Sequence, residues 1–146
     1  MTLQIRSCTP HDFKAVFVLF QQLWPNLELD EVGLLKVYHR ALAFATQHLV
    51  VGIMKERVVG FCSLSVRNNF RKAGYIGNVD ELVVDKDYRG RGIGKKLMRR
   101  IEEIAMQNQC TQIELESSFH RKEAHFFYES VGFKSRAYLF TKPVGR

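Results

Sequence analysis

Hydrophobic residues recur along the chain at two different spacings, which separate predicted helices from predicted strands. Phe13, Val16 and Phe20 recur at the spacing of one helix face. The segment Thr9-Pro10-His11-Asp12 before them combines an N-cap residue, a proline at the first helical position and an acid three residues after the cap. These features predict a first helix that ends near Trp24.

Three further segments have helical spacing. Asp30 can cap a helix over residues 30–45. A continuous apolar stripe predicts a long amphipathic helix over residues 92–108. A shorter helix is predicted over residues 122–131, and Gly132 suits its C-terminal cap.

Apolar runs with strand character occupy the segments between these helices. Two of the runs flank Glu56-Arg57, which predicts a hairpin at that point. The strands are predicted over residues 3–7, 49–55, 58–66, 75–84, 112–116 and 137–142.

The order of the predicted elements is β-α-α-β-β-β-α-β-α-β. Hairpins come first, and a β-α-β unit with a right-handed crossover follows. We therefore expect a single α/β domain over residues 1–146, with a central mixed sheet of about six to seven strands flanked by four helices. Ligands bind such sheets where a helix starts beside the carboxyl ends of parallel strands.

The composition is that of an ordinary globular protein, with 46% hydrophobic and 25% charged residues. The three cysteines are far apart and form no CxxC pair, so we expect reduced thiols and no metal site. The N-terminus has no signal-peptide core, and no apolar run approaches the roughly 20 residues of a membrane span. These features predict a cytoplasmic protein with no membrane partner.

The net charge of +7 is concentrated in one segment. Residues 86–100 contain seven basic residues and one acid, which accounts for six of the seven excess charges. Such a patch can steer a polyanion. For Arg89, Arg91 and Lys95 we favour a binding role, whereas a solvated helix face explains the later basic residues at least as well. Aromatic residues do not interleave with these charges, so we expect no nucleic-acid partner.

The run Arg89-Gly90-Arg91-Gly92-Ile93-Gly94 lies between the predicted strand at Glu81–Val84 and the long helix. Glycines at this junction leave backbone N–H groups bare at a helix N-terminus, where the helix dipole favours an anion. The glycine spacing differs from that of a dinucleotide fingerprint, and it is one residue short for a P-loop. The loop therefore predicts a phosphate-bearing ligand of another kind.

Two motifs together carry a family resemblance. Arg89 to Gly94 has the pattern R-x-x-G-x-G, and Ala124 to Phe133 reads AHFFYESVGF, which fits A-x-x-F-Y-x-x-x-G-F. In this order and spacing they resemble the GNAT superfamily of acetyl-CoA-dependent N-acetyltransferases. Within it, the chain looks most similar to small-amine enzymes such as aminoalkylphosphonate or aminoglycoside N-acetyltransferases.

The resemblance implies acetyl-CoA as the co-substrate, with its pyrophosphate on the glycine-rich loop. It also implies that a strand segment pairs through its backbone with the pantetheine arm, although this segment could equally be an ordinary buried strand. A backbone N–H near Val83 could polarise the thioester carbonyl. The expected cofactor-binding residues are Leu82, Val83, Val84, Arg89, Gly90, Arg91, Gly92, Ile93, Gly94 and Lys95.

The resemblance also implies Tyr128 as the general acid for the leaving thiolate, although Tyr128 could instead be a core aromatic. For the base, two carboxylates are candidates. Glu81 begins the apolar strand run, and Glu116 lies twelve residues before Tyr128, as the base does in ribosomal-protein alanine acetyltransferases. Asn78 stands where aminoalkylphosphonate enzymes carry their glutamate. A base acting through ordered water is a third alternative.

In this family the segment between the first two helices covers the acceptor. Here it contains Trp24 and Glu28, an aromatic and an acid that suit a small cationic amine. A protein N-terminus or lysine is the alternative acceptor, and a non-catalytic acetyl-CoA sensor or nucleic-acid-binding module is the rival from another class. Apolar Ala137 to Phe140 could complete a homodimer interface or form an internal edge strand.

Overall fold

The computed structural model describes residues 2–145, and its helices and strands follow the expected order as far as the last helix. The elements are β1 (Gln4–Ser7), the short 3-10 helix η1 (Pro10–Asp12), α1 (Phe13–Leu23), α2 (Glu31–Ala43), β2 (Gln47–Met54), β3 (Arg57–Asn69), β4 (Gly74–Val84), the 3-10 helix η2 (Lys86–Tyr88), α3 (Ile93–Gln107), β5 (Cys110–Leu115) and α4 (Lys122–Ser130).

The chain forms two compact units, Met1–Glu114 and Leu115–Arg146. The first contains β1 to β4, the first three helices and nearly all of β5. The second contains α4 and the C-terminal segment. The glycine-rich loop and Glu81 belong to the first unit, whereas Tyr128 and Glu116 belong to the second.

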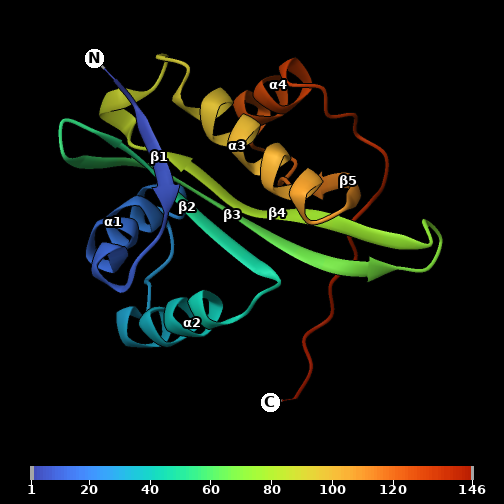
Figure 1. Cartoon of the computed structure of the whole chain (residues 1–146). Helices are drawn as coiled ribbons and strands as arrows, with labels where there is room; N and C mark the ends of the chain where they lie inside the picture. The colour runs from blue at the N-terminus through green and yellow to red at the C-terminus, as the bar shows by residue number, and fades with distance from the viewer. Residues whose placement is uncertain (1, 146) are drawn as a thin grey trace. The chain divides into compact units, whose positions relative to one another are not determined.

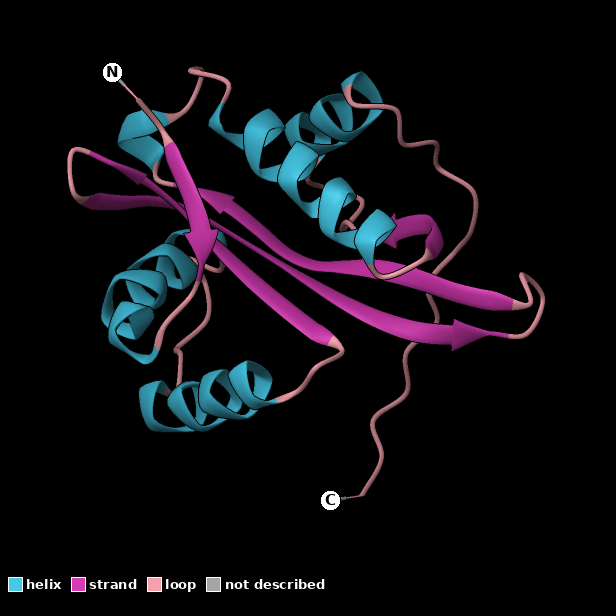
Figure 2. Cartoon of the chain, in the orientation of Figure 1, coloured by secondary structure: helices cyan, strands magenta, loops and turns pink. Residues whose placement is uncertain are grey.

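The sheet has five strands in the order β1-β2-β3-β4-β5. The three pairings from β1 to β4 are antiparallel. The arrowheads of β4 and β5 point the same way in Figure 2, so the sheet is mixed, with its parallel pair at the later strands as expected.

Helices of the first unit cover both faces of the sheet, with α1 and α2 on one face and α3 on the other (Figure 1). Gly52 and Gly60 stand opposite each other on β2 and β3, and a Cβ at Gly60 would lie 2.8 Å from Leu97 of α3. Their neighbours Val51 and Phe61 point to the other face and pack in the core with α1 and α2. The glycine pair lets α3 approach the sheet closely.

The expected strand over residues 137–142 is wrong, and the sheet has five strands rather than six to seven. Residues 133–145 have no regular secondary structure. Tyr138 and Phe140 are exposed. Strand propensity is not sufficient by itself, because an extended segment needs a neighbouring strand to satisfy its backbone.

Among residues 2–145, no helix combines the length and the apolar character that crossing a membrane requires.

The start of the first helical segment, where η1 leads into α1, has the cap that its sequence predicts and also an ion pair that was not predicted. The Arg6 guanidinium donates to both carboxylate oxygens of Asp12, at 2.7 and 2.9 Å. The Thr9 backbone N–H also donates to Asp12, at 2.7 Å, which completes a capping box. These contacts hold the pKa of Asp12 at about 2, chiefly through the Arg6 hydrogen bond.

We expect Asp12→Asn to lower the free energy of unfolding at neutral pH by roughly 2 kcal/mol. A depressed carboxyl pKa stabilises the fold above the ordinary value of 3.8, and that contribution is lost as pH falls toward 2. Urea unfolding measured between pH 7 and pH 2 tests this, with exposed Glu56→Gln as the control. An equally steep acid loss in the variant and the native protein would contradict the assignment.

Candidate active site

The glycine-rich loop has the backbone that its sequence predicts. Gly90 and Gly92 have φ values of 76° and 80°, which side chains of L residues rarely adopt. Gly92 is the N-cap of α3, and no atom lies within 4 Å of the position that its Cβ would take. Glycine is therefore required by the turn itself, and the space beside the turn is open.

The segment between β4 and α3 is held by hydrogen bonds within itself and to β3. The Asp85 N–H donates to the Val59 carbonyl at 2.8 Å, and the Tyr88 N–H donates to the Asp85 carbonyl at 2.8 Å. The buried Asp85 carboxylate accepts the Asp87 N–H at 3.0 Å. Arg89 Nε donates to the Val84 carbonyl at 3.1 Å. These bonds fix the path by which the strand leads into the loop.

Arg57 also supports the loop, which the sequence analysis missed. Its guanidinium lies 3.6 Å from the Asp85 carboxylate and 5.7 Å from the centre of the Tyr88 ring. The Arg91 guanidinium lies over the same ring, at 4.9 Å. Arg57 belongs to the β2–β3 hairpin, and no local sequence signal connects it with the loop.

The remaining expected cofactor residues divide between core and surface. Val83 and Ile93 are buried, whereas Leu82, Val84 and Gly94 are half-buried. Lys95 is exposed on the first turn of α3.

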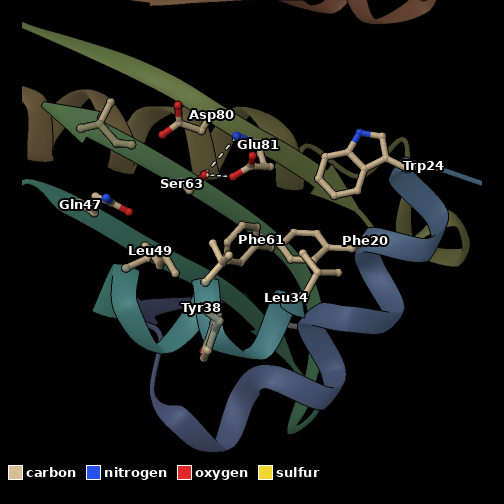
Figure 3. A pocket seen from close by; sticks show the side chains of 13 residues that line it. Phe20, Trp24, Leu34, Tyr38, Gln47, Leu49, Phe61, Ser63, Asp80 and Glu81 are labelled. Atoms are coloured by element: carbon tan, nitrogen blue, oxygen red, sulfur yellow. Dashed lines mark hydrogen bonds between the residues drawn. The ribbon is translucent and has the colours of Figure 1, made fainter. Parts of the chain in front are cut away.

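A cavity of about 250 Å³ lies between α1, α2 and the sheet, entirely within the first unit (Figure 3). Its floor is apolar and buried, and polar groups gather along one side. The lining residues are Phe20, Trp24, Leu34, Val37, Tyr38, Ala41, Gln47, Leu49, Phe61, Ser63, Leu64, Asp80 and Glu81.

A β-bulge brings two neighbouring carboxylates into this cavity. Ser63 of β3 pairs with Glu81, but Leu64 pairs with Val79, so Asp80 is an extra residue in β4. Side chains of consecutive strand residues normally point to opposite faces. At the bulge, Asp80 and Glu81 both line the cavity.

Glu81 is half-buried and is hydrogen-bonded to the neighbouring strand β3. The Glu81 carboxylate accepts a hydrogen bond from the Ser63 hydroxyl at 2.6 Å (Figure 3). The Glu81 backbone N–H donates to the Ser63 hydroxyl oxygen at 3.0 Å. Burial raises the pKa of Glu81, the Ser63 hydrogen bond opposes this rise, and the charge of Asp80 adds to it. A carboxylate with a raised pKa holds a proton more readily near neutral pH.

Asp80 was not identified from the sequence. It is exposed at the rim of the cavity, and the Asn78 side chain donates to its carboxylate at 2.7 Å. Aminoalkylphosphonate enzymes carry a glutamate at position 78, and here Asn78 instead holds the carboxylate of Asp80 by a hydrogen bond. The adjacent acids were visible in the sequence, but the bulge that turns both toward one cavity was not.

The two residues expected to contact the acceptor are separated. Trp24 lines the cavity, with its ring centre 5.3 Å from that of Phe20. Glu28 is exposed and is not among the lining residues.

In the second unit, Tyr128 is half-buried on α4, and its ring meets those of Phe127 and Phe133 edge-on at 5.6 and 5.9 Å. The Phe133 N–H donates to the Tyr128 carbonyl at 3.0 Å. Gly132 between them has a φ of 101°, in agreement with the expected helix cap. Glu116 is exposed just beyond β5.

Comparisons with known proteins identify the family of this chain. The model of the Acetyltransferase (GNAT) family matches residues 13–133. The chain is 32% identical over 141 residues to the aminoalkylphosphonate N-acetyltransferase of Salmonella typhimurium, which covers 97% of this chain and 91% of that protein.

Solved structures share the fold. A transcriptional regulator from Bacillus halodurans C-125 has a TM-score of 0.90 at 20% identity, covering 98% of this chain and 100% of that chain. An aminoglycoside N-acetyltransferase in complex with CoA has a TM-score of 0.86 at 17% identity, covering 98% and 96%. At such identities the likeness concerns the fold, because one fold can support different functions.

The match to the family model extends over most of the chain, and the Salmonella relative is similar over almost its whole length. The chain belongs to the GNAT family of acetyltransferases and is an acetyl-CoA-dependent N-acetyltransferase.

Proposed function

We propose that the protein transfers the acetyl group of acetyl-CoA to the primary amine of a small cationic molecule bound in the cavity between α1, α2 and the sheet. The observation that carries this proposal is the pair of carboxylates, Asp80 and Glu81, in a cavity whose other lining residues are mostly apolar or aromatic. They lie on the strand that leads into the glycine-rich loop, so a single element would position acceptor and donor.

The donor would bind along the end of β4 and the start of α3. Arg89 to Lys95 would hold the pyrophosphate, since the positive φ values of Gly90 and Gly92 expose backbone N–H groups at a helix N-terminus. Leu82 to Val84 pair with β3 on one side. β5 is six residues long and starts beside Tyr75 and Gly77, so it ends short of Leu82. The pantetheine arm would pair with the remaining edge of β4.

Glu81 would remove a proton from the acceptor ammonium. The free amine then attacks the thioester carbonyl and forms the new C–N bond, while a backbone N–H near Val83 stabilises the charge on the carbonyl oxygen. The C–S bond breaks as the tetrahedral species collapses. Tyr128 would protonate the leaving thiolate and recover a proton from the attacking nitrogen, which gives the N-acetylated amine, CoA and an unchanged Tyr128.

Between the two candidate bases, the local environments favour Glu81. Its carboxylate is half-buried, lines the cavity and has a raised pKa. Glu116 is exposed. A base must hold its proton during turnover, and the surroundings of Glu81 make this easier.

We expect Gly92→Val to weaken CoA binding about tenfold or more, because a hydrogen bond to a charged group contributes roughly 1.5–3 kcal/mol. Calorimetric titration with CoA measures this. Gly92→Asn is the matched variant, since asparagine tolerates a positive φ but still adds a side chain. It should fold more stably than the valine variant and still bind CoA weakly. Native affinity in both variants would refute the pyrophosphate assignment.

We expect Glu81→Gln to lower kcat by roughly 100-fold or more, while Glu102→Gln on the outside of α3 leaves kcat unchanged. Ser63→Ala should move the acid limb of the pH–rate profile to higher pH. The Ser63 hydrogen bond favours the carboxylate, so its loss raises the pKa of Glu81 further, and the base is active only above that pKa. If Glu116→Gln removes the acid limb instead, Glu81 is not the base.

Tyr128→Phe should reduce kcat by roughly 100-fold while leaving the affinity for acetyl-CoA near its native value, because the hydroxyl would act in thiolate departure. Tyr138→Phe is the control, since Tyr138 is an exposed tyrosine of the same unit. Thiol release measured at saturating amine separates the two variants. Equal kcat in Tyr128→Phe and the native protein would exclude the acid role.

A further inference from the structure

The floor of the acceptor cavity is unusually apolar for a site that handles a charged amine. Phe20 and Phe61 meet edge-to-face with ring centres 5.2 Å apart, and both are buried. Leu49 is buried in the same cluster and also belongs to the lining. Figure 3 shows Phe20, Phe61 and Leu34 on the side of the cavity away from the carboxylates.

Tyr38 extends this apolar floor despite its hydroxyl. The hydroxyl donates to the Thr9 carbonyl at 2.5 Å, which lies at the start of the first helices rather than in the cavity lining. Tyr38 therefore adds no free hydroxyl to the cavity. A ligand group that reaches the floor meets hydrocarbon and aromatic surface.

The charged side chains of the cavity all have one sign. Among the described residues that line it, Asp80 and Glu81 are acidic and none is lysine, arginine or histidine. The basic residues of this +7 protein are concentrated instead at residues 86–100. A phosphonate or phosphate group in the cavity would face two carboxylates without a compensating cation, and like charges at short range repel strongly.

We propose that the acceptor is an alkylamine or arylalkylamine, whose ammonium group lies beside Asp80 and Glu81 and whose apolar part lies on the floor formed by Phe20, Tyr38 and Phe61. Aminoalkylphosphonates, for which the Salmonella relative is named, are poor acceptors for this chain. This inference rests on the proposed function. The cavity of about 250 Å³ has room for an amine of the size of hexylamine or phenethylamine.

The test is a series of n-alkylamines from propylamine to hexylamine, each compared with the ω-aminoalkylphosphonate of equal carbon chain length. Thiol release from acetyl-CoA gives kcat/KM for each amine. Burial of one methylene contributes about 0.8 kcal/mol, so kcat/KM should rise about fourfold per carbon. Each phosphonate should be at least about tenfold poorer than its alkylamine partner.

A charge reversal at the rim of the cavity tests the same inference by changing the protein instead of the amine. Asp80 is exposed, so Asp80→Lys should fold normally. We expect this variant to raise kcat/KM for the phosphonates about tenfold or more and to lower it for the alkylamines. Glu102→Lys makes the same charge change outside the cavity and should alter neither.

The outcomes distinguish a failure of the acceptor class from a failure of the proposed function. Phosphonates that match or exceed the alkylamines, or a series that is flat with chain length, would overturn the acceptor class but leave amine acetylation standing. Turnover of no amine, with CoA binding intact, would overturn the proposed function itself and this inference with it.

Discussion

The one-residue bulge in β4 is the constraint on which the proposed site depends. It places Asp80 and Glu81 in the same cavity, although neighbouring residues of a regular strand point to opposite faces. Ser63 fixes the bulge from β3 through two hydrogen bonds to Glu81. Because the same strand continues to Val84 and into the glycine-rich loop, the geometry of the bulge also sets how far the carboxylates lie from the donor site.

Within the first unit, positive and negative charges gather at two different sites, the start of α3 and the cavity under α1 and α2. Cations gather at the start of α3, where the helix dipole and bare N–H groups already favour an anion. Acids line the cavity on the face covered by α1 and α2. The pair of glycines under Leu97 holds α3 close to the opposite face of the sheet. β4 thus connects a cavity suited to a cationic acceptor with a loop suited to a polyanionic donor.

Most of the fold could be predicted because its signals are local. Helix caps at Thr9 and Asp30 and the glycines of the loop act within a few residues of their positions in the chain. The strand expected at residues 137–142 failed for the converse reason, since pairing depends on a neighbour that no local pattern supplies. Arg57 was missed on the same ground, because its partners Asp85 and Tyr88 lie about 30 residues away in the sequence.

The sequence by itself was sufficient to predict the proposed donor site. The glycine-rich loop is a contiguous segment whose backbone conformation depends on its own glycines, so local residues suffice to predict it. Only the tertiary structure decided which carboxylate stands in the acceptor cavity, and that Trp24 lines it while Glu28 does not. The cavity is assembled from two helices and three strands, and the bulge that orients Glu81 is a property of strand register. Register and packing arise from contacts between distant segments, which a pattern along one chain does not specify.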